Sequence, residues 1–293
     1  MLSLVNQLIK KMKKILYNTD FSECSINAFV YALHLADQFN AEIITLHTYT
    51  RPVIGSMYLP NTYQNIYAHL ETDEFDMFKD TSKLLHIIAE KHQKEHVKNT
   101  FLMIEEFAID GMLQTIKKED VDIVVMGTKG ATGLKEVFLG SVTGHLMEQA
   151  PCPVLAIPEN AHYGNGLENI LFTSDFFPEE ISSLKYALDL SDNLNAHFEC
   201  INTAVDYNDY KEKLINDWKE KLQFTKYKDV NFSIIDASTI SEITEYISAN
   251  KIDLLITTIY KNNFIEALFH YSLAKRLAHH STIPILTIPN TKR

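Results

Sequence analysis

The second half of this sequence repeats the first, which constrains the fold more than any other feature. Two segments recur with the same spacing between their matching residues: Ile15–Ala41 recurs as Ile170–Ala196, and Asp122–Pro158 recurs as Asp253–Pro289. The second pair lies closer together in sequence, so the first half is longer between its second and third predicted strands. A chain of this length is expected to form two domains. Repetition on this scale indicates that both are copies of one unit.

A polar, glycine-bearing segment separates the two copies. Residues 159–166 read Glu-Asn-Ala-His-Tyr-Gly-Asn-Gly, which is the composition expected of a domain boundary. We therefore predict one domain over residues 12–158 and a second over residues 167–290. Residues 1–11 are not typical of a signal peptide, because their apolar part is short and no small-residue cleavage site follows. Their role stays open.

Each half alternates predicted strands and helices. Short apolar runs predict strands near residues 14–19, 42–48, 99–107, 121–126 and 153–157, and longer runs predict helices near 23–39, 74–96, 110–118 and 140–149. This alternation is typical of an α/β domain whose parallel sheet is covered by helices on both faces. In such sheets ligands bind beyond the carboxyl ends of the strands, at the point where the strand order reverses.

A glycine-rich loop follows the fourth predicted strand. Residues 126–141 read Met-Gly-Thr-Lys-Gly-Ala-Thr-Gly-Leu-Lys-Glu-Val-Phe-Leu-Gly-Ser and lead into a helix-like run. Glycines let backbone N–H groups approach an anion closely, and a helix N-terminus adds N–H donors and a partial positive charge. The loop therefore predicts a phosphate site. The alternative is that these glycines only shape turns.

The spacing G-x2-G-x9-G-S from Gly127 to Ser141 resembles the ATP-binding signature of the universal stress protein family. The flanking segments are similar as well: Lys14–Asp20 resembles the family's opening strand, and Pro151–Pro158 resembles its closing strand. Each half of the chain resembles one domain of the family, so the resemblance covers nearly the whole chain. It implies two tandem doubly wound α/β domains, each with a five-stranded parallel sheet in the order 3-2-1-4-5, paired through their last strands as an internal pseudo-dimer.

The resemblance also implies an adenine-nucleotide site in the first domain, for ATP, ADP or AMP with Mg²⁺. The glycine loop and the following helix start would hold the phosphates, Asp20 would lie near the ribose or the cation, and Thr48 would meet the adenine through its backbone. Asn18 stands where family members often carry proline, and Lys129 is either a phosphate contact or a solvated loop residue. The residues implied are Asn18, Thr19, Asp20, Thr48, Met126, Gly127, Thr128, Lys129, Gly130, Gly140, Ser141 and Val142.

The second half lacks the glycine signature. The aligned positions hold other residues: Gly127, Gly130 and Gly140 become Thr258, Lys261 and Tyr271. A tyrosine at a helix start cannot let a phosphate approach the backbone as glycine does. We therefore expect the second domain to keep the fold with a degenerate site, in which Asp175 is a turn or helix-capping residue.

No hydrolytic apparatus is evident in the sequence. No Walker lysine follows the glycine loop, and His145 is expected to pack or to be solvated. We predict no catalytic residues and at most slow ATP hydrolysis. We also predict no metal site built from side chains, because His92 and His96 share a face of a predicted helix without further ligands nearby. A nucleotide-dependent stress or regulatory protein is the favoured hypothesis, and a scaffold without nucleotide or a slow ATPase are the alternatives.

Charge and cysteine content restrict the cellular partners. The net charge of −11 argues against non-specific nucleic-acid binding. No stretch is long enough to span a bilayer, and three cysteines without paired spacing suit a reducing compartment. We predict a cytoplasmic protein with no membrane or nucleic-acid partner. Homodimer formation stays open, and the segment Tyr49–Tyr67 is either a lid over the nucleotide or a surface that packs on the second half.

Overall fold

A computed structural model describes residues 12–51, 60–128, 140–164, 166–203, 209–223, 225–227, 230–235, 240–260 and 282–290. The strands are β1 (Lys14–Asn18), β2 (Glu42–Tyr49), β3 (Asn99–Glu105), β4 (Ile123–Gly127), β5 (Val154–Ile157), β6 (Asn169–Thr173), β7 (His197–Thr203), β8 (Phe232–Ile235), β9 (Leu254–Tyr260) and β10 (Ile285–Asn290). The helices are α1 (Glu23–Phe39), α2 (Pro60–Lys91), α3 (Ala108–Glu119), α4 (Ser141–Gln149), α5 (Ile181–Leu194), α6 (Asp209–Leu222) and α7 (Ile240–Ala249), and a 3₁₀ turn, η1 (Pro178–Glu180), precedes α5.

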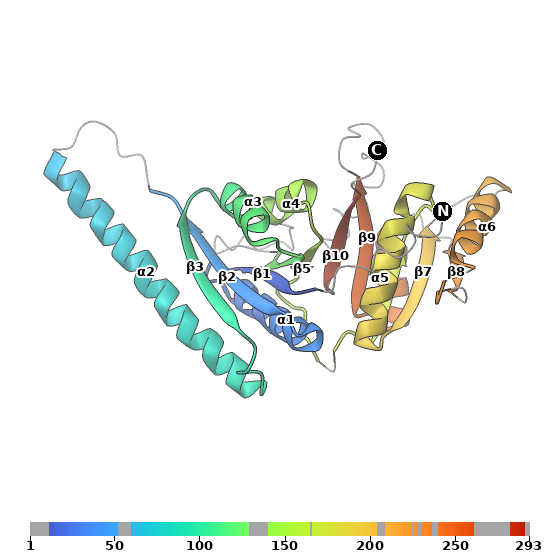
Figure 1. Ribbon diagram of the computed structural model, residues 1–293, viewed down its shortest axis with the longest axis horizontal. Coiled ribbons are helices and arrows are strands. Elements are labelled where there is room, and N and C mark those ends of the chain that lie inside the picture. Colours follow the sequence, from blue (N-terminus) through green and yellow to red (C-terminus); the bar gives the residue numbers. More distant parts are fainter. Residues whose placement is uncertain are drawn as a thin grey trace.

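The strands form one ten-stranded sheet in the order β3-β2-β1-β4-β5-β10-β9-β6-β7-β8. Within each half the paired strands are parallel and follow the order 3-2-1-4-5. The halves meet where β5 and β10 pair antiparallel, with Leu155 opposite Leu286 (Figure 1). The predicted α/β fold, its strand order and the pairing through the last strands are confirmed.

Helices cover both faces of this sheet. One buried core lies under α1, α2, α5 and α6, and the other lies under α3, α4 and α7. The first core contains Phe29 and Tyr31 from one half together with Phe172 and Trp218 from the other. Because both cores extend across the β5–β10 junction, the two halves share a continuous apolar interior.

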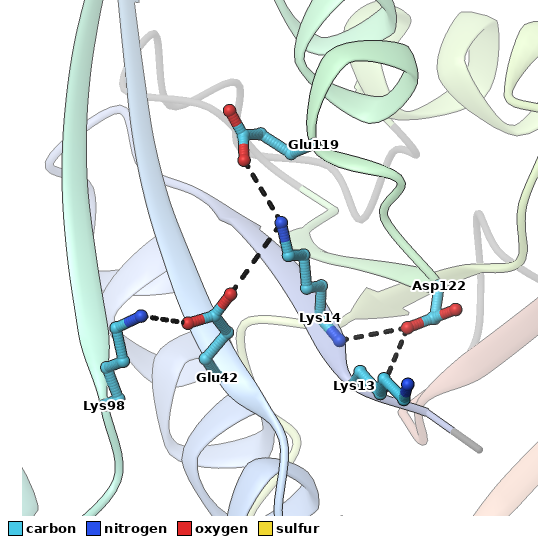
Figure 2. A network of polar contacts seen from close by, with 6 residues as sticks. All are labelled: Lys13, Lys14, Glu42, Lys98, Glu119 and Asp122. Atoms are coloured by element: carbon cyan, nitrogen blue, oxygen red, sulfur yellow. Dashed lines mark hydrogen bonds and ion pairs between the residues drawn. The ribbon is translucent and has the colours of Figure 1, made fainter.

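An aspartate fixes the amino end of the first strand in each half. Asp122 Oδ2 accepts hydrogen bonds from the backbone N–H groups of Lys13 at 2.8 Å and Lys14 at 3.0 Å (Figure 2). At the matching place in the second half, Asp253 Oδ2 accepts the backbone N–H of Asn169 at 2.9 Å. The repeat therefore extends to individual side-chain contacts.

Ion pairs extend this network along the amino edge of the first half. Lys14 Nζ lies 3.2 Å from Glu119 Oε2 and 3.8 Å from Glu42 Oε1, and Lys98 Nζ lies 2.5 Å from Glu42 Oε2 (Figure 2). These contacts link β1, β2 and α3 with the residue that precedes β3. They lie at the opposite edge of the half-sheet from the carboxyl ends of its strands.

Helix α2 differs from its prediction. The sequence predicts a helix over residues 74–96, but the helix runs from Pro60 to Lys91, beginning at a proline, which suits a first helical turn. It has 32 residues where α6 has 14, so it carries most of the extra length of the first half. It packs on α1 and β3, at the end of the sheet farthest from the second half (Figure 1).

The two alternatives for the Tyr49–Tyr67 segment stay predictions, because residues 52–59 lie outside the described residues; residues 60–67 form the start of α2. One expectation is wrong. His92 and His96 do not share a helix face, because both follow the end of α2. Instead His92 Nδ1 lies 3.0 Å from His34 Nε2, and His96 Nε2 lies 2.7 Å from Asp37 Oδ1.

Candidate functional site

The strand order reverses at β1, which lies between β2 and β4. Asn18 of β1 is opposite Leu46 of β2, and Tyr17 is opposite Val125 of β4. From β1 the chain continues to β2 on one side, while β4 lies on the other side. The carboxyl ends of these strands therefore form the topological switch point where α/β sheets bind ligands.

Ten of the twelve implied site residues lie in the described part of the chain, at or beside this switch point. Asn18 ends β1, and Thr19 and Asp20 follow it; Thr48 lies in β2. Met126 and Gly127 end β4, and Thr128 follows them. Gly140 is the N-cap of α4, and Ser141 and Val142 are its first residues. Lys129 and Gly130 lie outside the described residues.

Side-chain hydrogen bonds shape the turn between β1 and α1. Phe21 has a positive φ of 66°, and its backbone N–H donates to Thr19 Oγ1 at 3.1 Å. Asp20 Oδ1 accepts from the backbone N–H of Ser22 at 3.2 Å and from its hydroxyl at 2.5 Å. The Ser22 side chain in turn accepts from the Ser25 N–H and caps helix α1. The turn therefore holds the Asp20 carboxylate at the carboxyl edge of the sheet.

The side chain of Asn18 has an unsatisfied atom. Asn18 Oδ1 is buried and has no hydrogen-bond partner among the residues that the structure describes. A buried oxygen without a donor destabilises the fold by about 1–3 kcal/mol. An N–H donor of a ligand at this edge would satisfy it.

Close packing restricts both described glycines of the loop. A Cβ at Gly127 would lie 2.8 Å from Cys24 Sγ and 3.1 Å from the Cys24 carbonyl oxygen, and a Cβ at Gly140 would lie 2.9 Å from the Thr128 carbonyl oxygen. The Gly140 N–H donates to that same carbonyl at 2.6 Å, which joins the two ends of the loop. Both glycines therefore have a steric role of their own.

Helix α4 begins at the same edge. Its N-cap residue, Gly140, provides no side-chain cap, so the first N–H groups of the helix lack an intrahelical acceptor. Thr143 Oγ1 donates to the Gly127 carbonyl at 2.9 Å and ties the helix start to the end of β4. Ser141 is exposed, and His145 also faces solvent.

His47 lies at the centre of this edge, and sequence reasoning missed it. It is 6 % exposed, its Nδ1 lies 2.9 Å from the Thr19 carbonyl oxygen, and its Nε2 lies 3.0 Å from Glu74 Oε2 of helix α2. Its ring stacks on Phe21 at 4.1 Å between centroids. The available signal was a histidine inside the predicted strand, next to Thr48.

The matching edge of the second half carries a buried carboxylate. Glu180 Oε2 accepts hydrogen bonds from Ser174 Oγ at 2.7 Å and from the backbone N–H groups of Asp175 at 3.1 Å and Phe177 at 3.2 Å. Burial raises the pKa of Glu180 to about 7 despite these bonds. Asp175 lies in the turn after β6, in agreement with its expected role as a turn residue.

In the second half, residues with side chains stand at the position that matches the start of the glycine loop. Thr258 aligns with Gly127 and is buried, and its hydroxyl has no hydrogen-bond partner among the described residues. The Tyr260 hydroxyl is also buried, and burial together with the Glu180 carboxylate raises its pKa. Lys261 and Tyr271 lie outside the described residues. In the described ranges no cluster of three or more His, Cys, Asp or Glu side chains is arranged to hold a metal ion.

The comparison with protein families decides the assignment. A model described as "Universal stress protein family" matches residues 11–158, slightly more than half of the chain. The chain belongs to the universal stress protein family. Among curated relatives, a universal stress protein of Methanocaldococcus jannaschii is 30 % identical over 148 residues, covering 50 % of this chain and 81 % of the relative. One of Bacillus subtilis is 28 % identical over 150 residues, covering 49 % and 97 %.

A solved structure extends the similarity to both halves. The crystal structure of a universal stress protein from Archaeoglobus fulgidus aligns with 94 % of this chain and 98 % of its own, with a TM-score of 0.69. At 15 % sequence identity this match shows that the tandem fold is shared. None of the described helices is both long and apolar enough to cross a membrane.

Proposed function

We propose that this universal stress protein binds an adenine nucleotide at the carboxyl edge of its first half and acts as a nucleotide-dependent regulatory protein. The supporting observation is a convergence: Asp20, the Gly127–Thr128 strand end and the uncapped start of α4 all lie at one topological switch point. ATP with Mg²⁺ is the ligand we would test first. The domain limits 12–158 and 167–290 are part of this proposal.

The proposed contacts follow from what each group offers. The backbone N–H groups of the glycine loop and of Ser141 and Val142 would hold the phosphates. Asp20 would lie by the ribose or the phosphate-bound Mg²⁺, which prefers carboxylate and phosphate oxygens. The adenine would lie by Thr48 and Asn18, whose buried Oδ1 could accept a hydrogen bond from the exocyclic amino group. Binding, with at most slow ATP hydrolysis, is the proposed activity.

One observation favours the scaffold alternative. Gly127 is required by its contact with Cys24, whether or not a nucleotide binds. A glycine at this position is therefore compatible with a site that no longer functions. Gly140 is restricted by its own close contact with Thr128, so replacement of Gly130 is the glycine substitution that tests the two functions.

The internal repeat supplies a matched test. The first measurement is the nucleotide content of the purified chain, followed by equilibrium binding of ATP with Mg²⁺. Asp20→Asn is expected to weaken ATP binding by about tenfold or more, whereas Asp175→Asn, at the matching position, leaves it unchanged. Replacing Gly130 is expected to abolish binding, and replacing Lys261 is not.

The stoichiometry and the phosphate count separate the alternatives. One adenine nucleotide per chain supports a single site in the first half, and two per chain would contradict the degenerate second site. Bound ADP after incubation with ATP, with steady phosphate release, would favour the slow ATPase. Absence of nucleotide and of ATP binding would favour the scaffold.

A further inference from the structure

His47 is held between two hydrogen-bond partners. The Thr19 carbonyl oxygen lies 2.9 Å from Nδ1, and Oε2 of Glu74 lies 3.0 Å from Nε2. Both ring nitrogens of the imidazole therefore have a polar partner within hydrogen-bond distance. The side chain of His47 is 8 % exposed and that of Glu74 is 36 % exposed, so the pair is partly shielded from water. Hydrogen bonds in such surroundings are stronger than hydrogen bonds in water.

His47 and Phe21 on the first half's carboxyl edge contact Glu74 and Phe78 of helix α2; we call these four residues the clamp. Phe78 of the same helix lies 6.0 Å from the His47 ring and 6.5 Å from Phe21, measured between ring centroids, and is itself buried. Glu74 and Phe78 are four residues apart and therefore lie on one face of the helix. The neighbouring Arg51–Glu71 ion pair has both partners 43 % exposed and contributes less.

The residues under the clamp are continuous with the proposed nucleotide contacts. His47 precedes Thr48, its hydrogen bond fixes the carbonyl of Thr19, and its ring covers Phe21, so Asp20 lies between two clamped residues. A change in the docking of α2 would therefore be transmitted to Thr19, Asp20 and Thr48 through direct contacts.

The second half shows which part of His47's role is common to both copies. Asn202 occupies the matching position and donates from Nδ2 to the Ser174 carbonyl at 2.7 Å and to Asp175 Oδ1 at 3.0 Å. Ser174 matches Thr19, so a donor to this carbonyl is present in both halves. An imidazole has a second nitrogen on its far side, and in the first half this nitrogen reaches Glu74 of α2.

We propose that the contact between His47 and Glu74 couples the docking of helix α2 to occupancy of the nucleotide site. This inference rests on the proposed function. Docked α2 holds the Thr19–Phe21 turn in its binding geometry, so nucleotide and helix favour each other's bound state. Thermodynamic reciprocity requires that ATP then stabilise docked α2 by the same factor by which docked α2 strengthens ATP binding.

Hydrogen exchange of the full-length chain tests this coupling. In the wild type, ATP with Mg²⁺ is expected to slow amide exchange in residues 70–80 of α2 by about fivefold. Glu74→Gln and His47→Asn are expected to abolish this slowing and to weaken ATP binding by about fivefold. His47→Asn keeps a donor for the Thr19 carbonyl, as Asn202 does, so its effect reports the contact with α2.

Glu90→Gln is the matched control. It makes the same change on the same helix, at an exposed carboxylate that pairs with His86 at 3.3 Å, and should behave like the wild type. The coupling is overturned if ATP binds the wild type while α2 exchange does not respond, or if Glu74→Gln keeps the wild-type response. Absence of ATP binding by the wild type is a different result, which overturns the proposed function and the coupling together.

Discussion

The glycine at position 127 lies so close to helix α1 that a side chain would collide with Cys24. Two of the nearest atoms, at 3.1 Å from a Cβ built there, belong to the backbone of Cys24, which cannot rotate away. Gly111 on α3 makes a useful comparison, because its Cβ would meet the methyl group of Thr48 at 2.7 Å. That methyl belongs to a side chain that can adjust.

Gly127→Ala is therefore expected to lower the free energy of unfolding by about 1–3 kcal/mol without any nucleotide present, because overpacking shifts the backbone. Gly111→Ala is expected to be nearly neutral, since alanine favours the helix by about 1 kcal/mol and offsets the adjustment of Thr48. Urea unfolding of both variants without ligand measures the difference. Equal stability of Gly127→Ala and the wild type would contradict the steric argument.

The buried carboxylate of Glu180, in the second half, is expected to make the free energy of unfolding depend on pH. Burial raises its pKa to about 7 from 4.5, so the folded chain binds more protons than the unfolded chain between these values. Its contribution to stability is therefore fully present below pH 4.5 and is lost as the pH rises through 7. Glu180→Gln should remove this loss, which amounts to about 2–3 kcal/mol.

Urea unfolding at pH 5 and pH 8 measures the effect. The neighbouring Glu179 is exposed, so Glu179→Gln is the matched control and should keep the wild-type difference. If Glu180→Gln kept it too, the carboxylate would not be the titrating group.

At the level of elements, the end of α2 is attached to α1 by a cluster of titratable groups. His34 on α1 contacts His92 at 3.0 Å and stacks on Tyr163, and Asp37 pairs with Lys94 and His96. Burial, followed by the charges of Lys94 and His92, lowers the pKa of His34 to about 4. This junction lies at the carboxyl end of α2, whereas Glu74 lies near the middle of the helix.

The sign of the resulting pH dependence is opposite to that of Glu180. Between pH 6.5 and 4 the folded chain binds fewer protons at His34 than the unfolded chain does, so stability falls as the pH falls through this range. His34→Gln should reduce that slope in urea unfolding. His86→Gln, at an exposed histidine on α2, should not change it.

The sequence predicted some elements closely and others poorly, for identifiable reasons. Helix α1 has the predicted bounds, because a buried face recurs along its whole length between a serine cap and Asn40. The start of α2 was missed, because residues 60–73 include several asparagine, threonine and tyrosine residues, which have low helix propensity. The helix forms there without a local pattern that would predict it.

At the level of the whole molecule, the shared core predicts cooperative unfolding. Trp218 is the single tryptophan of the chain and is fully buried in the second half, so its fluorescence reports that half alone. Far-ultraviolet circular dichroism reports both halves. Because the two cores cross the β5–β10 junction, both signals should change at the same urea concentration.

A substitution in the first half tests the same point. Gly127→Ala should shift the midpoint of the Trp218 fluorescence transition together with that of circular dichroism. Two separate transitions, or a fluorescence midpoint that ignores the substitution, would mean that the halves unfold independently.

Some residues of the candidate site could be predicted from the sequence, and others could not. The glycine loop, Asp20 and Thr48 were predicted from spacing and family resemblance, and their binding role remains a prediction. Glu74 and His47 could not be paired from sequence, because α2 and β2 are joined by a segment without a recognisable pattern and the contact depends on how the helix is docked. Residues that bring distant elements together require the fold before they can be found.

The antiparallel β5–β10 junction lets the two copies change independently at their carboxyl edges. Because the strands of one half run opposite to those of the other, the carboxyl ends of each half lie on opposite edges of the sheet. After duplication, one copy can therefore lose the glycine signature and acquire a buried carboxylate at its own edge while it still completes the common interior, and the glycine signature at the opposite edge of the other copy is kept.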